Sequence, residues 1–518
     1  MLPLPDEMPK WYTVEPEQER GWTPKTEDII EVFGLPEVIK AWENNLNLQN
    51  SKQFTIKLDR LQIISPIQVG AGSVFEGGIL PAQIGGLPCI PASSIRGALL
   101  KWIKDKWEDI PINEREFWQN LILDKFCGWK PKRIRFESIY LKNLLKAFPL
   151  HSQQKWQIFN KKSKQLSVQW QVQPKEPPGI SSNKLCVQIL LRTNSIDVTN
   201  EQKKWLETRL TEMLQCQGIG RGTSSGFGRL AASIPSGNWQ IKLTGMKPCV
   251  QQLDRKKQQW GKYRWSPQVL RANLRGYFTR LALPLLSEEN ALKLTDKIFG
   301  SLNSPAQLVL TSYLFHIKKA SIGQALHKKY ANIESKDAHS NWLINVNCNS
   351  EFQELVGALL NLASYLGGLG PGWRRPPHEL KSFSGYRGSE FTLTLTEFTL
   401  TSANLEESIE ELIKRLQKII LNLAHVHGLP ALLNPVKILG SVISIWQGET
   451  KLWEKIVHDI CRSDKSKNPN PNRPSWCGTT ECPSKYTVRQ HENFCLVTVF
   501  DPDVEGTLKS MGFKQVWC

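Results

Sequence analysis

A pattern of three stations occurs twice, in the same order, along this chain. The first station is an Arg-Gly pair inside an expected helix, the second is a short DK-containing turn, and the third is a glycine-rich loop. The first copy consists of Ile90–Trp107, DKFCGW at Asp124–Trp129 and GIGRGTSSGFGRL at Gly218–Leu230; the second consists of Ser266–Ala282, DKIFGS at Asp296–Ser301 and GGLGPGWRR at Gly367–Arg375. A repeat of this length predicts two copies of one supersecondary unit.

The segments around the stations predict the fold class. Strand-like segments precede the copies at Phe54–Ser65 and Asn238–Gln251, and apolar runs follow the second stations at Arg133–Leu141 and Ala306–Phe315. Each unit therefore has the order β, loop, α, β, inserted region, α, glycine loop, β. This alternation predicts an α+β fold with two tandem ferredoxin-like domains, each with helices on one face of its sheet and an inserted region.

At 518 residues the chain is too long for one core of ordinary size. We expect an N-terminal extension at residues 1–49, a first domain at 50–236, a second domain at 237–425 and a Cys-containing extension at 426–518. Asn404–Ala424 has the apolar periodicity of a helix, and Asp464–Trp476 has the Pro, Asn and Ser content of a flexible loop.

The charge balance restricts the partners. The 66 Lys and Arg residues exceed the 48 Asp and Glu residues and give a net charge of +18, which favours a polyanionic partner such as nucleic acid. No run of about 18 apolar residues occurs, and the N-terminus lacks the basic and apolar regions of a signal peptide. We therefore expect a cytoplasmic protein that does not bind membranes.

The glycine loops are the first candidates for binding RNA. Glycine lets backbone N–H groups approach a phosphate closely, and an arginine in the same loop adds charge. The alternative is that the glycines serve only the geometry of a tight helix-to-strand connection. A mononucleotide P-loop is disfavoured, because neither loop ends in Gly-Lys-Ser/Thr at the start of a helix.

Basic residues on the two Arg-Gly helices and in two insertions add to these candidates. In the first helix Ser93 or Ser94 is also able to cap the N-terminus. Lys155–Lys175 and Asp254–Trp265 interleave aromatic and basic residues, a pattern suited to stacking on bases and neutralising phosphates, or else to packing within their own domain. The predicted RNA-binding residues are Ser93, Ser94, Arg96, Lys101, Lys161, Lys162, Gly218, Gly220, Arg221, Thr223, Ser224, Ser225, Arg229, Arg255, Lys256, Lys257, Arg271, Arg275, Gly368, Gly370, Arg374 and Arg375.

IPASSIRGALLKW together with GIGRGTSSGFGRL resembles the helix signature and glycine loop of the RAMP (repeat-associated mysterious protein) superfamily. The second copy is similar to a more divergent branch, in which Pro371, Pro376 and Pro377 depart from the usual loop. The resemblance covers residues 50–400. It implies a backbone subunit of a type III CRISPR effector complex, built from tandem ferredoxin-like (RRM-like) RAMP domains. In each, an RRM-like palm would hold guide RNA (crRNA), and an inserted β-hairpin thumb would divide the guide–target duplex. Its partners would be crRNA, target RNA and the other effector subunits.

The resemblance also raises the question of catalysis. Active backbone subunits of this family carry an aspartate between the first strand and the first helix. The first unit has Glu76 but no aspartate there, and the second offers Asp254. Asp254 would hold Mg²⁺ in a target-RNA endonuclease, or it is a surface aspartate paired with Arg255 or Lys256. RNA binding itself is expected to need no cofactor. A protein that only assembles other subunits is a third hypothesis.

The C-terminal extension contains a cluster of cysteines near His458 and His491. Cys461, Cys477, Cys482 and Cys495 fall close together but lack the paired two-residue spacing of a zinc ribbon. They form either a Zn²⁺ site or a set of reduced thiols in a loop-rich tail.

Overall fold

The structure is a computed structural model with two compact units. The first comprises Met1–Leu150, Gln165–Pro235 and Gln252–Gln259, and the second comprises His151–Lys164, Ser236–Gln251 and Trp260–Cys518. The predicted domain boundaries stay predictions. The structure describes residues 53–58, 61–70, 78–79, 81–84, 87–124, 128–129, 134–140, 145–150, 167–172, 185–191, 198–246, 250–254, 259–301, 304–319, 340–367, 388–393, 405–436, 438–456, 460, 472–477, 485–491 and 493–518.

The first unit mixes helices and short strands, as predicted for an α+β fold. A sheet of order β1-β12-β8 has antiparallel neighbours, and small sheets β10-β11-β3, β4-β5-β9, β6-β7 and β13-β2 accompany it. The elements are β1 Gln53–Leu58, β2 Gln62–Ile63, β3 Gly78–Ile79, β4 Gln83–Ile84, β5 Leu87–Ile90, α3 Ala92–Asp105, η2 Trp107–Asp109, α4 Ile112–Ile122, β6 Leu123–Asp124, β7 Gly128–Trp129, β8 Ile134–Phe136, β9 Ile139–Tyr140, β10 Leu145–Leu150, β11 Ser167–Val172, β12 Leu185–Leu191, α6 Asn200–Glu212, η3 Met213–Gln217, η4 Thr223–Ser225 and β13 Leu230–Ala231.

Helix α3 forms where the first Arg-Gly station predicts it. Ile95, Leu99 and Ile103 recur every four residues and are buried in the core of the first unit, and the opposite side of the helix is exposed. The predicted serine cap is wrong. The cap position is Pro91, so Ser93 and Ser94 already lie inside the first turn, and the amide of Ala92 donates instead to Ser138 Oγ at 3.2 Å.

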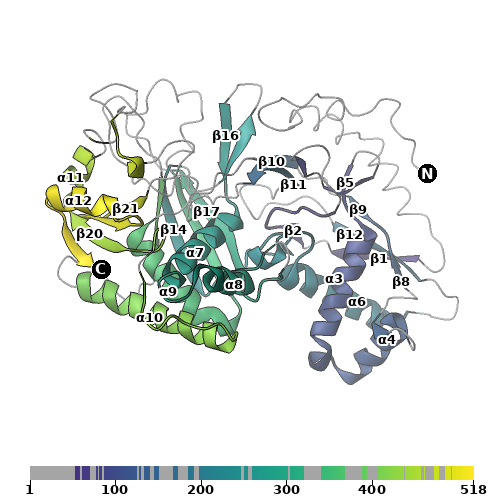
Figure 1. Ribbon diagram of the computed structural model, residues 1–518. Helices are drawn as coiled ribbons and strands as arrows, with labels where there is room; N and C mark the ends of the chain where they lie inside the picture. The colour runs from purple at the N-terminus through teal and green to yellow at the C-terminus, as the bar shows by residue number, and fades with distance from the viewer. Residues whose placement is uncertain are drawn as a thin grey trace. The chain divides into compact units, whose positions relative to one another are not determined.

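A buried ion pair joins two helices of the first unit. Glu114 of α4 accepts two hydrogen bonds from Arg209 of α6, at 2.8 and 2.7 Å, and one from Trp118 Nε1 at 2.9 Å. The third guanidinium nitrogen of Arg209 donates to Glu212 at 2.8 Å. Hydrogen bonding to Glu114 raises the pKa of Arg209, so the arginine stays charged. Helices α3 and α6 both pack on the β1-β12-β8 sheet (Figure 1).

The second unit contains a sheet of order β17-β18-β14-β19 with antiparallel neighbours. Strands β15 and β16 form a separate two-stranded sheet, whose residues are divided between the two units. None of the described helices in either unit is both long and apolar enough to cross a lipid bilayer. The elements are β14 Trp239–Met246, β15 Val250–Asp254, β16 Gln259–Arg264, α7 Pro267–Ala282, α8 Glu288–Phe299, β17 Leu310–Lys319, β18 Ser340–Cys348, η7 Ser350–Phe352, α9 Gln353–Leu366, β19 Gly388–Leu393, α10 Leu405–Val426, β20 Ser444–Gly448, α11 Thr450–Lys455, η9 Ser475–Cys477, β21 Tyr486–Gln490, β22 Cys495–Val499, α12 Asp503–Ser510 and β23 Lys514–Trp517.

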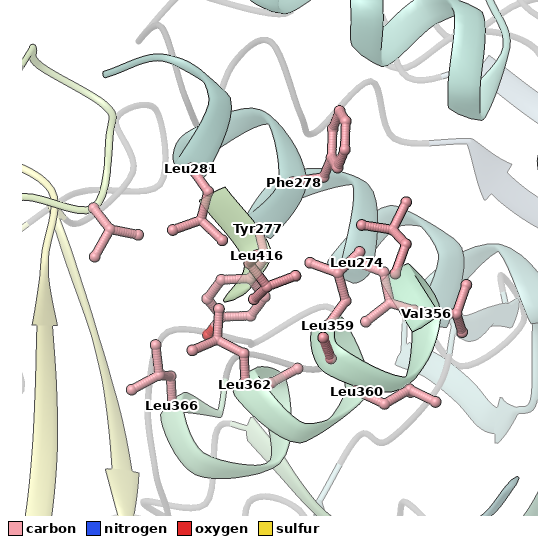
Figure 2. Packing of buried hydrophobic residues seen from close by; sticks show 14 of the residues in the cluster. Leu274, Tyr277, Phe278, Leu281, Val356, Leu359, Leu360, Leu362, Leu366 and Leu416 are labelled. Carbon is pink, nitrogen blue, oxygen red and sulfur yellow. The ribbon is translucent and has the colours of Figure 1, made fainter. Parts of the chain in front are cut away.

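Helices α7, α9 and α10 contribute much of the core of the second unit. Figure 2 shows Leu274 and Tyr277 of α7 packed with Leu359 and Leu362 of α9, and Leu416 of α10 joins the same cluster. All five side chains are at most 1 % exposed. Helix α10 occupies the range where the sequence predicts a periodic helix. It buries a stripe that includes Leu416 and exposes most of its charged residues.

The C-terminal region forms a second sheet within this unit, which the sequence analysis did not predict. Its elements follow the order β20, α11, β21, β22, α12, β23, and its sheet has the order β21-β22-β20-β23. The second, third, first and fourth strands therefore lie side by side, as in β17-β18-β14-β19. One face of the sheet, with Ile445 and Leu496, joins the core beneath α9 and α10; the other, with Trp446 and Val497, packs under α11 and α12 (Figure 1).

Candidate nucleic-acid interface

The exposed side of α3 carries most of its basic residues. Ser93, Gly97, Lys101 and Lys104 lie along one row at helical spacing, opposite the buried row, and Arg96 is exposed beside them. Lys101 pairs with Asp105 at 2.5 Å. Within the described part of the chain, the side chains of Arg96 and Lys104 make no hydrogen bond or ion pair. This side of the helix therefore presents two uncompensated cations.

The first glycine loop follows α6 and η3 and folds tightly on itself. At Gly228 the φ is +72°, and a Cβ there would lie 1.9 Å from the carbonyl oxygen of Ile219. At Gly220 the φ is +93°, and a Cβ would lie 2.4 Å from the carbonyl oxygen of Gln68. These two glycines are needed for close backbone packing, so they serve the geometry of the tight helix-to-strand connection.

The segment after β1 holds this loop in place. The amide of Gly228 donates to Pro66 O, the amide of Arg221 donates to Gln68 O, and the amide of Arg229 donates to Ser65 Oγ, each at 2.9 Å. The loop is thus a rigid edge attached to its own domain. The amides of Gly220 and Gly222 donate to no acceptor among the residues that the structure describes, and both glycines are exposed.

The two arginines of this loop differ in their surroundings. Arg221 is exposed, and its guanidinium makes no ion pair or hydrogen bond within the described ranges. Arg229 is 1 % exposed and donates from Nη2 to Thr223 O at 3.1 Å, which ties the two ends of the loop together. Thr223 and Ser224 are half-buried and Ser225 is buried. Arg221 is therefore the residue of this loop whose charge faces solvent.

The loop and the Arg-Gly helix lie beside each other. Gln217 Nε2 donates to the carbonyl oxygen of Ala98 at 3.2 Å, and Trp102 Nε1 donates to Glu212 at 3.3 Å. Ala98 and Trp102 are four residues apart, so this flank of α3 faces α6 and η3. The next row, which contains Gly97 and Lys101, is exposed. We call the exposed residues of this helix and this loop the α3–loop surface (Ser93, Arg96, Gly97, Lys101, Lys104 and Gly220–Gly222).

In the second unit the arginines of the Arg-Gly helix make internal hydrogen bonds. Arg271 is 8 % exposed and donates to the carbonyl oxygens of Leu308, at 3.3 Å, and Phe299. Arg275 donates to Gly300 O at 2.6 Å and to Asp296 at 2.5 Å. Burial, followed by the neighbouring charge of Arg275, lowers the pKa of Arg271 to about 10. Both arginines hold the second station against α7; RNA contacts by them stay a prediction.

The start of the second glycine loop is held from two sides. Tyr277 of α7 donates its hydroxyl to Gly367 O at 2.6 Å, and a Cβ on Gly367 would lie 3.3 Å from Arg489 Cβ of the C-terminal sheet. His491 stacks on Phe494, and its Nε2 lies 3.0 Å from Tyr365 O. Burial lowers the pKa of His491 to about 4, so the ring is neutral and donates to this carbonyl.

Other predicted site residues fall outside this geometry. Asp254 is the last residue of β15, and its side chain is outside the described residues. Cys477 and Cys495 are buried in the apolar core of the C-terminal sheet, and among the described residues no group of three or more His, Cys, Asp or Glu side chains is placed to hold a metal. The predicted residues that lie outside the described ranges are Lys161, Lys162, Arg255, Lys256, Lys257, Gly368, Gly370, Arg374, Arg375, Cys461 and Cys482.

Sequence reasoning left three contributors to the α3–loop surface out of the predicted site. Gly97 and Lys104 share the exposed row of α3, and the helical spacing from Ser93 was available to identify both. Gly222 lies next to Arg221 and contributes an open amide. Gln217, which joins the loop to α3, gave no signal in the sequence.

A comparison with known proteins places part of the chain in a family. The family model described as "RAMP superfamily" matches residues 60–231. Two similar solved structures are Cmr1 from Pyrococcus furiosus in its apo form, at 12% identity over 54% of this chain and 98% of that chain with a TM-score of 0.30, and the Type III-B Cmr-beta bound to cognate target RNA, at 9% identity over 54% and 94% with a TM-score of 0.28. No curated protein matches the sequence.

Proposed function

Because residues 60–231 belong to the RAMP superfamily, we propose that this chain is an RNA-binding subunit of a type III CRISPR effector complex. In this function it holds the guide RNA (crRNA) and the guide–target duplex for antiviral defence. Its partners are these RNAs and the other subunits of the complex. Binding requires no metal or cofactor, because the groups proposed to contact RNA are cations, hydroxyls and backbone amides.

The strand orders support the tandem architecture that the proposal includes. In the second unit β14, α7, β17, β18, α9 and β19 follow the order βαββαβ of a ferredoxin-like domain, and their strands lie side by side as second, third, first, fourth. In the first unit β1, β12 and β8 repeat the first three positions of this order. The hairpin insertions β10–β11 and β15–β16 occupy positions suited to thumbs.

The observation that carries the proposal is the α3–loop surface. Arg221 extends into solvent between two glycines with open amides, and the exposed cations of α3 lie on the adjacent helix. Amides beside an arginine suit a phosphate oxygen, and Arg96 and Lys104 suit the phosphates that follow. None of the residues in the surface is aromatic, so it is suited to the sugar-phosphate backbone, which positions RNA without reading its sequence.

The other hypotheses gain less support. A target-RNA endonuclease would depend on Asp254 and Mg²⁺, and the side chain of Asp254 lies outside the described residues. A pure assembly protein would leave the cations of the α3–loop surface without a partner of opposite charge, unless an acidic protein covers them. The assembly hypothesis predicts that the loss of Arg221 leaves RNA affinity unchanged.

A salt titration tests the proposal. The dissociation constant of the purified chain for a labelled single-stranded RNA of mixed sequence is measured by fluorescence anisotropy at increasing salt. Arg221→Ala should weaken binding about tenfold and reduce the slope of log affinity against log salt by about 0.7, since one phosphate contact is lost. The matched control is Arg415→Ala, which removes the same charge from exposed α10, where it pairs with Glu354.

Equal losses from Arg221→Ala and Arg415→Ala would contradict the proposal, because they would reflect net charge alone. So would a wild-type chain whose affinity for RNA does not depend on salt. An acidic protein used as competitor separates the assembly hypothesis: it should displace RNA only weakly if the surface is built for phosphates.

A further inference from the structure

Gly97 occupies the middle of α3, where a glycine is unfavourable. A helix-interior glycine costs about 0.5–1 kcal/mol relative to alanine. Within the described part of the chain, no heavy atom lies within 4 Å of the position that a Cβ on Gly97 would take, and its φ is not in the left-handed region. Neither packing nor backbone conformation within its own unit therefore calls for glycine at this position.

Other helix glycines can be compared with Gly97, to ask whether packing within the protein explains a glycine at each position. In α9 a Cβ on Gly357 would lie 3.3 Å from the ring of Trp239, so packing favours glycine there. Gly276, in the second Arg-Gly station, is half-buried, but among the described residues it also has no heavy atom within 4 Å of an added Cβ. The space beside the glycine is therefore a feature of both copies of the Arg-Gly motif. Gly506 in α12 is also open, but its neighbours Asp503 and Glu505 are acidic.

The surroundings of Gly97 indicate what approaches it. Ser93 and Lys101 precede and follow it on the same exposed row, and Arg96 and Lys104 add charge without a described partner. The neighbouring flank of α3 is occupied by Gln217 at the base of the glycine loop. A bare stretch of helix backbone thus lies at the centre of a basic surface.

We propose that the sugar-phosphate backbone of RNA lies directly against α3 at Gly97, closer than a side chain of any size would permit. The inference rests on the proposed function and deepens it, because it names the part of the RNA that touches the helix and the residue that sets the approach. Contact with the helix backbone lets Ser93 and Lys101 reach successive phosphates. A methyl group at position 97 holds the RNA off this surface without changing its charge.

Substitutions of graded size test this close approach. Gly97→Ala and Gly97→Leu replace glycine by good helix formers, so both should raise the urea midpoint of unfolding. They should also weaken binding of the labelled single-stranded RNA, by about tenfold for alanine and more for leucine, since the loss of one or two contacts is of this size. A variant that is more stable and binds less well is not explained by damage to the fold.

The matched controls are Gly506→Ala and Gly506→Leu, which change an equally open helix glycine in an acidic setting. They should raise the urea midpoint and leave the dissociation constant unchanged. Wild-type affinity in both Gly97 variants would overturn the inference while leaving the proposed function intact, and so would equal losses in the Gly506 variants. A wild-type chain that does not bind RNA would overturn the proposed function and this inference together.

Discussion

The two Arg-Gly helices contain the same motif and use its arginine in opposite ways. Arg96 of α3 extends into solvent, whereas Arg275 of α7 is half-buried and bonded to Asp296 and to the carbonyl oxygen at position 300. In the first unit a different pair, Glu114 and Arg209, joins α4 to α6. The same motif arginine therefore faces solvent in one unit and stabilises the fold in the other.

The same division occurs within a single loop. Arg221 and Arg229 are eight residues apart in one glycine-rich segment, yet the first is exposed and the second is buried against Thr223 O. The sequence analysis treated these two arginines alike. Only the fold separates Arg221, which faces solvent, from Arg229, which shapes the loop.

The largest expected effect is at the ion pair of the first unit. Glu114→Gln leaves the largely buried guanidinium of Arg209 without its main partner, so the free energy of unfolding should fall by about 4 kcal/mol. Urea unfolding followed by circular dichroism measures this. A loss below about 1 kcal/mol would show that the ring contact of Phe117 with Trp205, rather than the ion pair, holds α4 against α6.

The next largest effect is at the structural arginines of the second unit. Arg271→Ala removes two hydrogen bonds to buried carbonyls and leaves a cavity beneath α7, so it should cost about 3 kcal/mol of unfolding free energy. Arg96→Ala makes the same change on α3 and should stay within about 0.5 kcal/mol. Similar losses in the two variants, measured by urea unfolding, would remove the contrast between the helices.

A smaller effect separates the two arginines of the first glycine loop. Arg229→Ala should lower the free energy of unfolding by about 2 kcal/mol, because a buried side chain that closes the loop is lost. Arg221→Ala should leave stability within about 0.5 kcal/mol and act on RNA affinity alone. Urea unfolding of both variants makes the comparison. If Arg221→Ala destabilised the chain as much as Arg229→Ala, Arg221 would belong to the scaffold.

A pH dependence is expected at the second glycine loop. The pKa of His491 lies near 4 in the folded chain against an ordinary value of 6.5, so between these values the unfolded chain binds more protons. Its contribution to stability is present above pH 6.5 and is lost as the pH falls toward 4, by at most about 1.4 kcal/mol per pH unit. His491→Gln keeps a donor for Tyr365 O but does not titrate, so the difference between the two stability curves isolates the histidine. If the difference between the two stability curves did not change with pH, the imidazole ring of His491 would be exposed to water.

The sequence predicted the parts of the fold that have long periodic signals. Helices α3 and α10 fall where apolar spacing places them, whereas helices α4 and α8 are additional to the order predicted for the two units. The C-terminal sheet was not predicted because its strands do not alternate apolar and polar residues. Strand Cys495–Val499 is buried at every position, between two layers of helices. Helices α11 and α12 are also too short to show a clear period.

The sequence predicted which basic residues the candidate site contains, but not which of them are exposed and which are buried. The sequence identified Arg221 and Arg229, or Arg96 and Arg271, as equivalent cations. Burial depends on contacts far away in the chain, such as that of the Arg229 amide with Ser65 or of Arg271 with Leu308 O, and no local pattern encodes them. The role of the helix glycine was missed because a glycine with nothing near it becomes informative only when its surroundings are known.

The central claim is that RNA lies on the α3–loop surface of the first unit. Hydrogen–deuterium exchange of the whole chain, with and without the single-stranded RNA, tests this most directly. The amides of Gly220 and Gly222 are open in the described structure, so RNA should slow exchange in a peptide covering 218–229 and leave one covering 405–426 of α10 unchanged. Bound RNA that protects α10 or another region, with exchange at 218–229 unaltered, would contradict the account.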